Sequence, residues 1–444
     1  MIKKDSSAKS VFSACGLSSK MLARIARETG FSKRAGGKIS AADFLAHFSA
    51  ESIEGTVSGN DIAATLHAAT GVSVSRQACW ERIDDQCLSF FKAVLEKLIH
   101  LRVTSEGWMT CPKYKRILIQ DSTIIQLPAK LYKSFSGVRN ATSTTCHARI
   151  QGVYDLCAGR FTQFSIDPYF KNDLSVAADI QVSEGDLLLR DRGYFVLSVI
   201  SMHKANGVDT ISRYKHKTML HDAQTQEKID LLDLLTRDGT VDMMVMAGEN
   251  KELNVRLLAV PVPEEVANLR RMKAKKETKG HAPSSELLAL MSWSIFLVTV
   301  PDSIITIKHV MAIYGLRWRI ENIFKTWKSY FNFSRVHQVS ENHLRILLTA
   351  RLIMISICFH NAYVPLFNAI KHRTQQHLSL IKFMRYVCQN PSQLPTLVAQ
   401  RLWSNSLLKA IARYCAYDKR KRSTFVDNLL AVFEDLSDIA SSLA

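Results

Sequence analysis

Residues 186–191 read Asp-Leu-Leu-Leu-Arg-Asp, and residues 116–121 read Arg-Ile-Leu-Ile-Gln-Asp. Each stretch is a short apolar run of strand length that ends in an acid. This pattern predicts a buried β-strand with a carboxylate, Asp191 or Asp121, at its C-terminal end. Residues 149–167 are expected to form two further strands, and residues 174–181 a helix. The alternation of predicted strands and helices indicates an α/β fold with acids at strand ends.

The composition favours a folded protein of several domains. The chain has 444 residues, too many for one hydrophobic core, and 47% of them are hydrophobic against 22% charged. The formal net charge is +18. A surplus of this size indicates a polyanionic partner, either nucleic acid or a membrane surface, and a soluble basic protein without such a partner is the alternative.

The membrane alternative is weak. The most apolar run, residues 347–359, is too short to span a bilayer and contains Arg351, so we expect a buried helix. No apolar stretch of signal length follows the N-terminal Met-Ile-Lys-Lys. The nine cysteines include no Cys-x-x-Cys pair, which indicates reduced thiols in a cytoplasmic protein. The expected partner is therefore nucleic acid, with no membrane.

The flanking regions have other periodicities. Residues 1–110 are expected to be helical, and a helix, a turn containing Gly71 and a second helix from Arg76, capped by Ser75, resemble a helix-turn-helix. An ordinary pair of packed helices fits equally well.

Residues 205–302 predict a mostly β region, with strands near Ile211 and at residues 243–246, 255–260 and 293–300. The region also carries a basic arm, formed by Arg270, Arg271, Lys273, Lys275, Lys276 and Lys279. The rest, to residue 444, is expected to be helical.

A long helix is expected over residues 307–330. On a wheel of about 100° per residue, Tyr314, Arg317, Glu321 and Lys328 lie within about 60° of one another, beside an apolar stripe. The polar stripe presents a phenol, a carboxylate and two cations. A solvated helix face with an ordinary ion pair is the alternative.

The three acids suggest metal-ion chemistry. Asp121, Asp191 and Glu321 offer the hard oxygen ligands that Mg²⁺ or Mn²⁺ prefers. Two such ions can stabilise both the entering and the leaving oxygen of an in-line phosphoryl displacement. Arg317 and Lys328 would hold phosphate oxygens beside the site. Basic charge elsewhere would hold the rest of the DNA.

The order and spacing of Tyr314, Arg317, Glu321 and Lys328 resemble the signature of the insertion-sequence-four family of bacterial transposases. Residues 119–123, Ile-Gln-Asp-Ser-Thr, resemble the family's first acidic motif, with Ser122 where glycine is usual. Residues 190–194, Arg-Asp-Arg-Gly-Tyr, resemble the second. The similarity extends from about residue 20 to about residue 360.

The resemblance implies an RNase H-like catalytic core interrupted by a mostly β insertion domain, with helical N-terminal and C-terminal regions. The expected regions are a DNA-binding N-terminal region (1–110), the first part of the core (111–204), the insertion domain (205–302), the second part of the core (303–360) and a C-terminal region (361–444).

The resemblance also implies cut-and-paste transposition of an insertion sequence. Water cuts one strand at the transposon end, the freed 3′-hydroxyl attacks the other strand to form a hairpin, and the reopened end joins a target. The implied enzyme binds two Mg²⁺ or Mn²⁺ ions, the terminal inverted repeats and the target DNA. It would act as a dimer in a synaptic complex, associated with the nucleoid in the bacterial cytoplasm.

Further residue roles follow from the resemblance. Tyr314, Arg317 and Lys328 would contact phosphates near the cleaved end. Trp293 resembles a tryptophan that stacks on a flipped base, and a core tryptophan is the alternative. Arg213 resembles another DNA-contacting position, and the basic arm is expected to contact DNA.

A nuclease that does not join ends and a non-catalytic DNA-binding protein are competing hypotheses. The complete set of acids and the Tyr-Arg-Glu-Lys series favour the transposase.

Overall fold

The structure is a computed structural model that describes residues 7–33, 37–55, 57–101, 111, 113–140, 143–277, 282–302, 304–418 and 427–434. The chain forms two compact units. Unit 1 comprises Met1–Thr110, Ser122–Lys171 and Arg319–Val426, and unit 2 comprises Cys111–Asp121, Asn172–Trp318 and Asp427–Ala444. Strand β1 (Arg116–Leu127) and helix α12 (Trp318–Tyr330) each contribute residues to both units.

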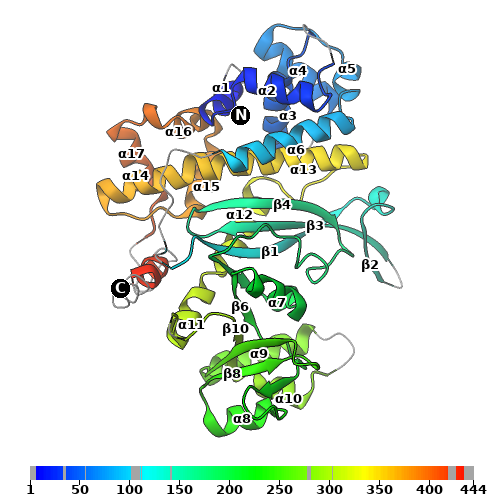
Figure 1. The fold of residues 1–444 in the computed structure, drawn as a ribbon. Coiled ribbons are helices and arrows are strands. Elements are labelled where there is room, and N and C mark those ends of the chain that lie inside the picture. Colours follow the sequence, from blue (N-terminus) through cyan, green and yellow to red (C-terminus); the bar gives the residue numbers. More distant parts are fainter. Residues whose placement is uncertain are drawn as a thin grey trace. The chain divides into compact units, whose positions relative to one another are not determined.

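In unit 1, helices from both ends of the chain share one core. The N-terminal helices are α1 (Ser7–Ala14), α2 (Ser19–Glu28), α3 (Ala41–Glu54), α4 (Gly59–Thr70), α5 (Arg76–Trp80) and α6 (Asp85–His100). The later helices are α13 (Glu341–Ser356), α14 (Val364–Thr374), α15 (Leu380–Gln389), α16 (Leu394–Val398) and α17 (Asn405–Cys415), with a π-helical segment, η3 (Ile357–Tyr363), between α13 and α14. Helix α13 packs against α3 and α6, as Figure 1 shows.

The expected helix, turn and helix near residues 61–98 is present in an altered form. Helix α4 ends at Gly71 in the left-handed conformation. Ser75 caps α5 as predicted, since its Oγ accepts a hydrogen bond from the Ala78 amide at 3.1 Å. The second helix, however, ends at Trp80. The Asp84 carboxylate accepts from the Cys87 amide at 2.8 Å and begins a new helix, α6, there. The predicted second helix is therefore divided between α5 and α6.

The apolar run near the C-terminal third forms a core helix. Helices α13, η3 and α14 are continuous over Glu341–Thr374, which by length and composition alone could cross a membrane. Its most apolar window has a mean hydropathy of 1.5 and is entirely buried inside the protein. Such burial is typical of the core helix of a soluble protein. The buried helix predicted at residues 347–359 is confirmed.

Arg351 joins three segments inside this core. Its fully buried guanidinium donates to the carbonyl oxygens of Ser52 at 2.8 Å and Gly55 at 2.6 Å, both at the end of α3. It also donates to the carbonyls of Phe333 at 3.3 Å and Arg335 at 2.9 Å, which follow α12. Burial lowers the pKa of Arg351 to about 10, so it remains a cation at neutral pH. It satisfies four carbonyls, three through buried hydrogen bonds and one through a partly buried bond.

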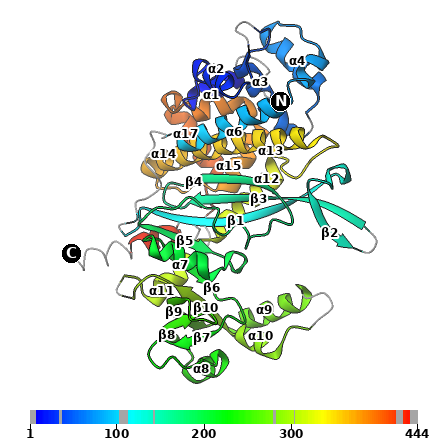
Figure 2. The ribbon, with the colours of Figure 1, turned by 45° about the vertical axis from the view of Figure 1, so that its right-hand side comes forward.

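The strands of unit 1 lie under these helices. Strand β3 (Ser143–Asp155) pairs antiparallel with β2 (Ser136–Asn140) and β4 (Arg160–Pro168), which confirms the two strands expected at residues 149–167. Helices α6 and α13 contact β4, and Figure 2 shows them alongside it. Helix α12 is fixed through Trp327, whose buried ring lies 5.1 Å from that of Phe161 in β4.

Unit 2 contains a mixed sheet. Strand β5 (Asp186–Arg190) is parallel to β1 and to β6 (Asp209–Arg213). The order continues antiparallel through β10 (Trp293–Val298), β9 (Leu253–Pro261), β8 (Val241–Ala247) and β7 (Leu220–Asp222). The helices are α7 (Leu197–Ala205), α8 (Leu231–Asp238), α9 (Glu264–Glu277), α10 (Ser285–Leu290) and α11 (Ile307–Gly315). The predicted α/β class and all strands predicted in this region are confirmed.

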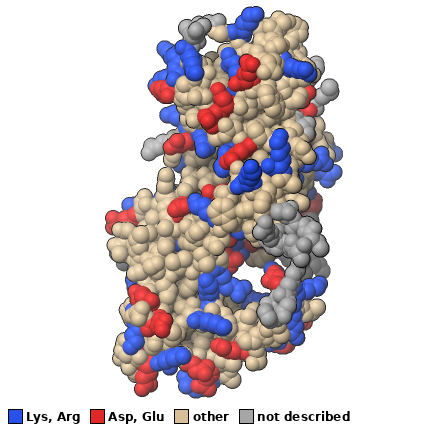
Figure 3. Space-filling model, turned by 90° about the vertical axis from the view of Figure 1, so that its right-hand side faces the viewer, with Lys and Arg blue, Asp and Glu red and all other residues tan. Residues whose placement is uncertain are grey.

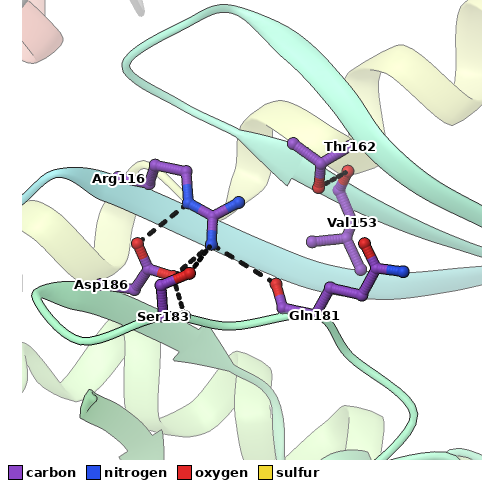
Figure 4. Close-up of polar contacts among 6 residues, drawn as sticks. All are labelled: Arg116, Val153, Thr162, Gln181, Ser183 and Asp186. Atoms are coloured by element: carbon purple, nitrogen blue, oxygen red, sulfur yellow. Dashed lines mark hydrogen bonds and ion pairs between the residues drawn. The ribbon is translucent and has the colours of Figure 1, made fainter. Parts of the chain in front are cut away.

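An ion pair fixes the register of β1 and β5. Asp191 follows the end of β5 as predicted, but Asp121 does not end its strand, because β1 continues to Leu127 and only its pairing with β5 stops at Gln120. Arg116 begins β1 and Asp186 begins β5, and the two residues are paired in the sheet. The Arg116 Nε donates to Asp186 Oδ1 at 2.9 Å, and a second contact joins Nη2 to the other carboxylate oxygen. The Ser183 amide also donates to this fully buried carboxylate at 2.7 Å. Figure 4 shows how these groups converge.

Two of the helix predictions are wrong. Residues 174–181 form turns and extended backbone, because Ser175 is bonded back to Asn172 and the carbonyls of Val176 and Ala177 accept side-chain hydrogen bonds. The long helix expected at residues 307–330 is broken into α11 and α12. After Gly315, the amides of Leu316 and Arg317 bond three residues back, to Ile313 and Tyr314, and end the first helix.

Replacing Arg351 with methionine should destabilise unit 1. The apolar side chain fills a similar volume but leaves four carbonyls, three of them in buried hydrogen bonds, without their charged donor. We expect the free energy of unfolding to fall by about 3 kcal/mol or more. Urea unfolding followed by circular dichroism measures this loss. Arg401→Met, at an exposed position, serves as the control and should stay within about 0.5 kcal/mol of the unchanged protein. Equal midpoints for the two variants would contradict the structural role of Arg351.

Candidate active site

Asp121 and Asp191 lie at the same level of adjacent parallel strands. Gln120 of β1 is paired with Arg190 of β5, and each acid is the next residue in the sequence. Neighbouring strands are about 4.8 Å apart, so two carboxylates at this level are close enough to share one cation. Both acids are partly exposed. The structure thus places two of the three predicted acids together in unit 2.

Arg317 contacts the first of these acids. Its Nη1 donates to Asp121 Oδ2 at 3.1 Å, and only 9% of the Arg317 side chain is exposed. The break between α11 and α12 places Arg317 in the turn between the two helices and not on a continuous helix face. The continuous helix face assumed for the helical wheel over residues 307–330 is therefore wrong.

Tyr314 and Arg213 line the same part of unit 2. The Tyr314 hydroxyl donates to the carbonyl oxygen of Arg190 at 3.3 Å. Burial raises the pKa of Tyr314 to about 12, so the phenol stays protonated and can donate. The Arg213 guanidinium lies 5.4 Å from the Phe296 ring centre and 5.8 Å from that of Tyr314. Arg317 stacks on the same tyrosine at 5.8 Å, so two cations flank one ring.

Glu321 and Lys328 belong to unit 1. Glu321 is partly buried in the first turn of α12. The exposed Lys328 Nζ donates to the carbonyl oxygen of Ile124 in β1 at 3.0 Å, and burial lowers the pKa of Lys328. Helix α12 therefore holds the third predicted acid one turn after Arg317, on a helix anchored by Trp327.

The two aspartates of unit 2 offer carboxylate donors for a metal ion. Among the residues that the structure describes, no three His, Cys, Asp or Glu side chains are grouped closely enough to hold a metal ion. Asp121 is instead paired with Arg317. The available donors at the strand ends are carboxylate oxygens, which suit a hard divalent cation and do not suit a thiolate-type zinc site. In their chemistry, Asp121 and Asp191 fit part of the expected ligand set.

Trp293 has intramolecular partners in the structure. It begins β10, and its indole Nε1 donates to the carbonyl oxygen of Gly239 at 2.9 Å. The ring is partly buried and packs on the apolar core formed in part by Leu235, Val245 and Leu257. The contacts describe a tryptophan that contributes to the packing of this region in the DNA-free chain.

The predicted basic arm forms a helix. Residues Arg270, Arg271, Lys273, Lys275 and Lys276 lie in α9, and Lys279 lies outside the described residues. The Arg270 Nη1 donates to the Trp293 carbonyl at 3.0 Å, and the Arg271 Nε donates to the Leu288 carbonyl at 3.1 Å. These two arginines therefore support the fold around β10 and α10.

The three lysines of α9 are exposed. Lys273 is near Glu277 of its own helix at 3.7 Å, and Lys275 and Lys276 project into solvent. Figure 3 shows one face of the molecule, on which Lys and Arg are interspersed with Asp and Glu. Lys273, Lys275 and Lys276 are thus the accessible cations of the predicted arm.

Two polar residues near the acids were not singled out from the sequence. Gln120 and Arg190 each immediately precede an acid, and both are buried, at 2% and 0% exposure. A polar residue in an apolar strand, at the same position before each of two acids, is a signal that the sequence does contain.

Comparisons with known proteins agree on the kind of protein. The family described as Transposase DDE domain matches residues 112–357, more than half of the chain. The transposase for insertion sequence element IS231D of Bacillus thuringiensis subsp. finitimus is 28% identical over 394 residues and covers 82% of each chain. The transposase for element IS1151 of Clostridium perfringens is 27% identical over 364 residues, covering 75% of this chain and 76% of its own.

A solved structure shows a weaker likeness. The cryo-EM structure of the piggyBac transposase synaptic complex with hairpin DNA is 10% identical, with a TM-score of 0.42, and covers 90% of this chain and 82% of that one.

The match of the DDE domain includes Asp121, Asp191 and Glu321 and all the strands described in unit 2. This chain belongs to the Transposase DDE domain family.

Proposed function

We propose that this DDE transposase moves an insertion sequence by a cut-and-paste route of the insertion-sequence-four type. Its metal-binding carboxylates would be Asp121, Asp191 and Glu321, on an RNase H-like core with an inserted domain. The observation that carries the proposal is the in-register placement of Asp121 and Asp191 on adjacent parallel strands, beside Arg317. The similarity to insertion-sequence transposases over most of the chain supports it.

The chain's own residues have distinct roles in this proposal. When bound, two Mg²⁺ or Mn²⁺ ions would stabilise the entering and leaving oxygens of the phosphoryl displacement. Arg317, already beside Asp121, would hold a phosphate oxygen. Arg213, oriented by the Tyr314 and Phe296 rings, would neutralise backbone charge nearby. Lys328 on α12 would add a further phosphate contact.

The proposed substrates are double-stranded transposon ends and target DNA. Binding of terminal inverted repeats would involve the N-terminal helices, and pairing of two ends would require a dimer in the synaptic complex.

The hairpin route would use Trp293 as a stacking platform for a flipped base. We propose that the protein works in the bacterial cytoplasm, on the nucleoid.

Removal of any one acid should abolish strand cutting and leave end binding intact. Asp121→Asn, Asp191→Asn and Glu321→Gln keep the size of each side chain while weakening the metal ligand. We expect cleavage to fall by more than about 100-fold, beyond the usual effect of losing an outer partner of a metal site. A gel assay on a labelled transposon end measures cutting, and a filter-binding assay measures affinity.

The control for these variants is Asp233→Asn, an exposed acid of α8, which should cut normally. Excess chelator should stop cutting by the unchanged protein, and Mg²⁺ or Mn²⁺ should restore it. Normal cutting by any of the three variants, or cutting in chelator, would refute the proposed site.

The lysines of α9 should contribute to the salt dependence of DNA binding. Lys273→Gln, Lys275→Gln and Lys276→Gln together should flatten the plot of log affinity against log salt by up to about 2.7, since each phosphate contact contributes about 0.9. The matched control replaces three exposed cations of the C-terminal region, Arg401, Lys409 and Arg413, with glutamine. A slope identical to that of the unchanged protein would show that α9 does not contact DNA.

Trp293 should matter for hairpin formation more than for nicking. Losing a stacking partner costs about 1–3 kcal/mol, so Trp293→Ala should slow hairpin formation roughly 10- to 100-fold while the first nick persists. Trp293→Phe keeps a ring but removes the bond to Gly239, and should lose less. The assay resolves nicked, hairpin and double-strand-break products. Parallel loss of nick and hairpin in Trp293→Ala would assign this residue to the core alone.

A further inference from the structure

A layer of buried polar side chains lies behind the two aspartates in unit 2. Gln120 of β1, Arg190 of β5 and Ser212 of β6 are paired across the sheet, so their side chains point to the same face. All three are buried, with at most 2% exposure. Because side chains alternate along a strand, Gln120 lies on the face opposite Asp121.

Two of these side chains hold the same short segment. Gln120 Nε2 donates to the carbonyl oxygen of Val176 at 3.1 Å, and Arg190 Nη2 donates to that of Ala177 at 2.5 Å. The segment between Asn172 and Ala178 is a series of turns, not a helix. The residue before each aspartate thus bonds to one of two consecutive carbonyls, although the two strands are far apart in the sequence.

The segment also contacts the turn that follows Asp191. Val176 and Ala177 form a buried apolar cluster with Tyr194, which ends that turn. A Cβ on Gly193 would lie 3.1 Å from the Asp173 carboxylate, so the Asp173 side chain lies close against the Gly193 backbone. The segment is therefore bound to β1, to β5 and to the backbone just after the second aspartate.

We propose that Gln120 and Arg190 are positioning residues, which clamp the segment Asn172–Ala178 behind the sheet and so fix the separation of the Asp121 and Asp191 carboxylates. The inference rests on the proposed function, in which these two acids bind metal. The clamp couples β1 and β5 through one segment, so neither aspartate can shift along the strand direction without breaking a buried hydrogen bond. Outer partners that orient metal ligands commonly govern metal affinity in this way.

Ser212 provides a matched control on the same buried face. It is paired with Arg190 in the sheet, yet its Oγ has no hydrogen-bond partner among the described residues. Ser212→Ala removes a buried hydroxyl beside the clamp without touching the Val176 or Ala177 carbonyl. A role in packing alone would make Ser212→Ala and the clamp variants alike, whereas the clamp predicts that only the latter affect the aspartates.

The first experiment measures the clamp without metal or DNA. Hydrogen exchange followed by mass spectrometry on the full chain compares Gln120→Met, which keeps the length of the side chain but removes its donor, with Ser212→Ala. We expect peptides covering residues 172–181 and 191–195 to exchange faster by at least about tenfold in Gln120→Met, and exchange elsewhere in unit 2 to be unchanged. Unchanged exchange at residues 172–181 would overturn the clamp whatever the protein's activity.

The second experiment measures the effect on metal use. The Mn²⁺ concentration that gives half-maximal nicking of a transposon end should rise about 10- to 100-fold in Gln120→Met and Arg190→Met, with near-normal rates at saturating Mn²⁺. Arg190→Lys keeps the charge and one donor for the Ala177 carbonyl, and should recover most of the affinity. Electron paramagnetic resonance of free Mn²⁺ gives the bound fraction directly, without turnover.

The outcomes separate the two proposals. A rate lowered equally at every Mn²⁺ concentration, or an equal shift in Ser212→Ala, would overturn the positioning role while leaving the catalytic acids in place. If Asp121→Asn and Asp191→Asn still cut DNA, the proposed function fails, and a faster exchange in Gln120→Met would then still show the clamp as a feature of the fold.

Discussion

The geometry of the proposed active site depends on the register of β1 and β5, which the Arg116–Asp186 ion pair sets at their first residues. The carboxylate is fully buried and accepts hydrogen bonds from a guanidinium and a backbone amide, so a shifted register would leave a buried charge without its partner. From this pair the strands run in parallel to Gln120 and Arg190, and the next residue on each is an aspartate. Two acids far apart in the sequence are thereby brought to one level of the sheet.

The break between α11 and α12 gives the cationic side of the site its shape. A continuous helix would keep Tyr314, Arg317 and Glu321 on one stripe, with their relative positions fixed by helical geometry alone. In the structure, the turn after Gly315 lets Arg317 reach Asp121 while the Tyr314 hydroxyl reaches the Arg190 carbonyl. Tyr314 then serves as the shared surface for Arg213 and Arg317, so two like charges are kept beside the acids by one aromatic ring.

Local patterns predicted the strands well, because alternation and apolar runs report burial directly. The acids Asp121 and Asp191 followed from those strands, and their proximity followed from parallel pairing. Residues 174–181 were mispredicted because their carbonyls bond to Gln120 and Arg190, and tertiary partners of this kind leave no mark on local periodicity. The break after Gly315 was missed for a similar reason, since apolar spacing continues across it. The roles of Arg270 and Arg271 depend on the carbonyls of Trp293 and Leu288, which no charge count reveals.

The shared core of unit 1 has a consequence for the order of folding. Helices α3 and α6 bury their apolar faces against α13, and Arg351 of α13 satisfies the carbonyls at the end of α3. During synthesis at about 5–20 residues per second, the ribosome needs roughly 10–50 s to make the chain between His100 and Glu341. Throughout that interval the first helices have no complete core, and their contacts are among the most non-local in the protein. The N-terminal helices of this transposase therefore reach their final packing only late in translation, after the strands that carry both aspartates have been made.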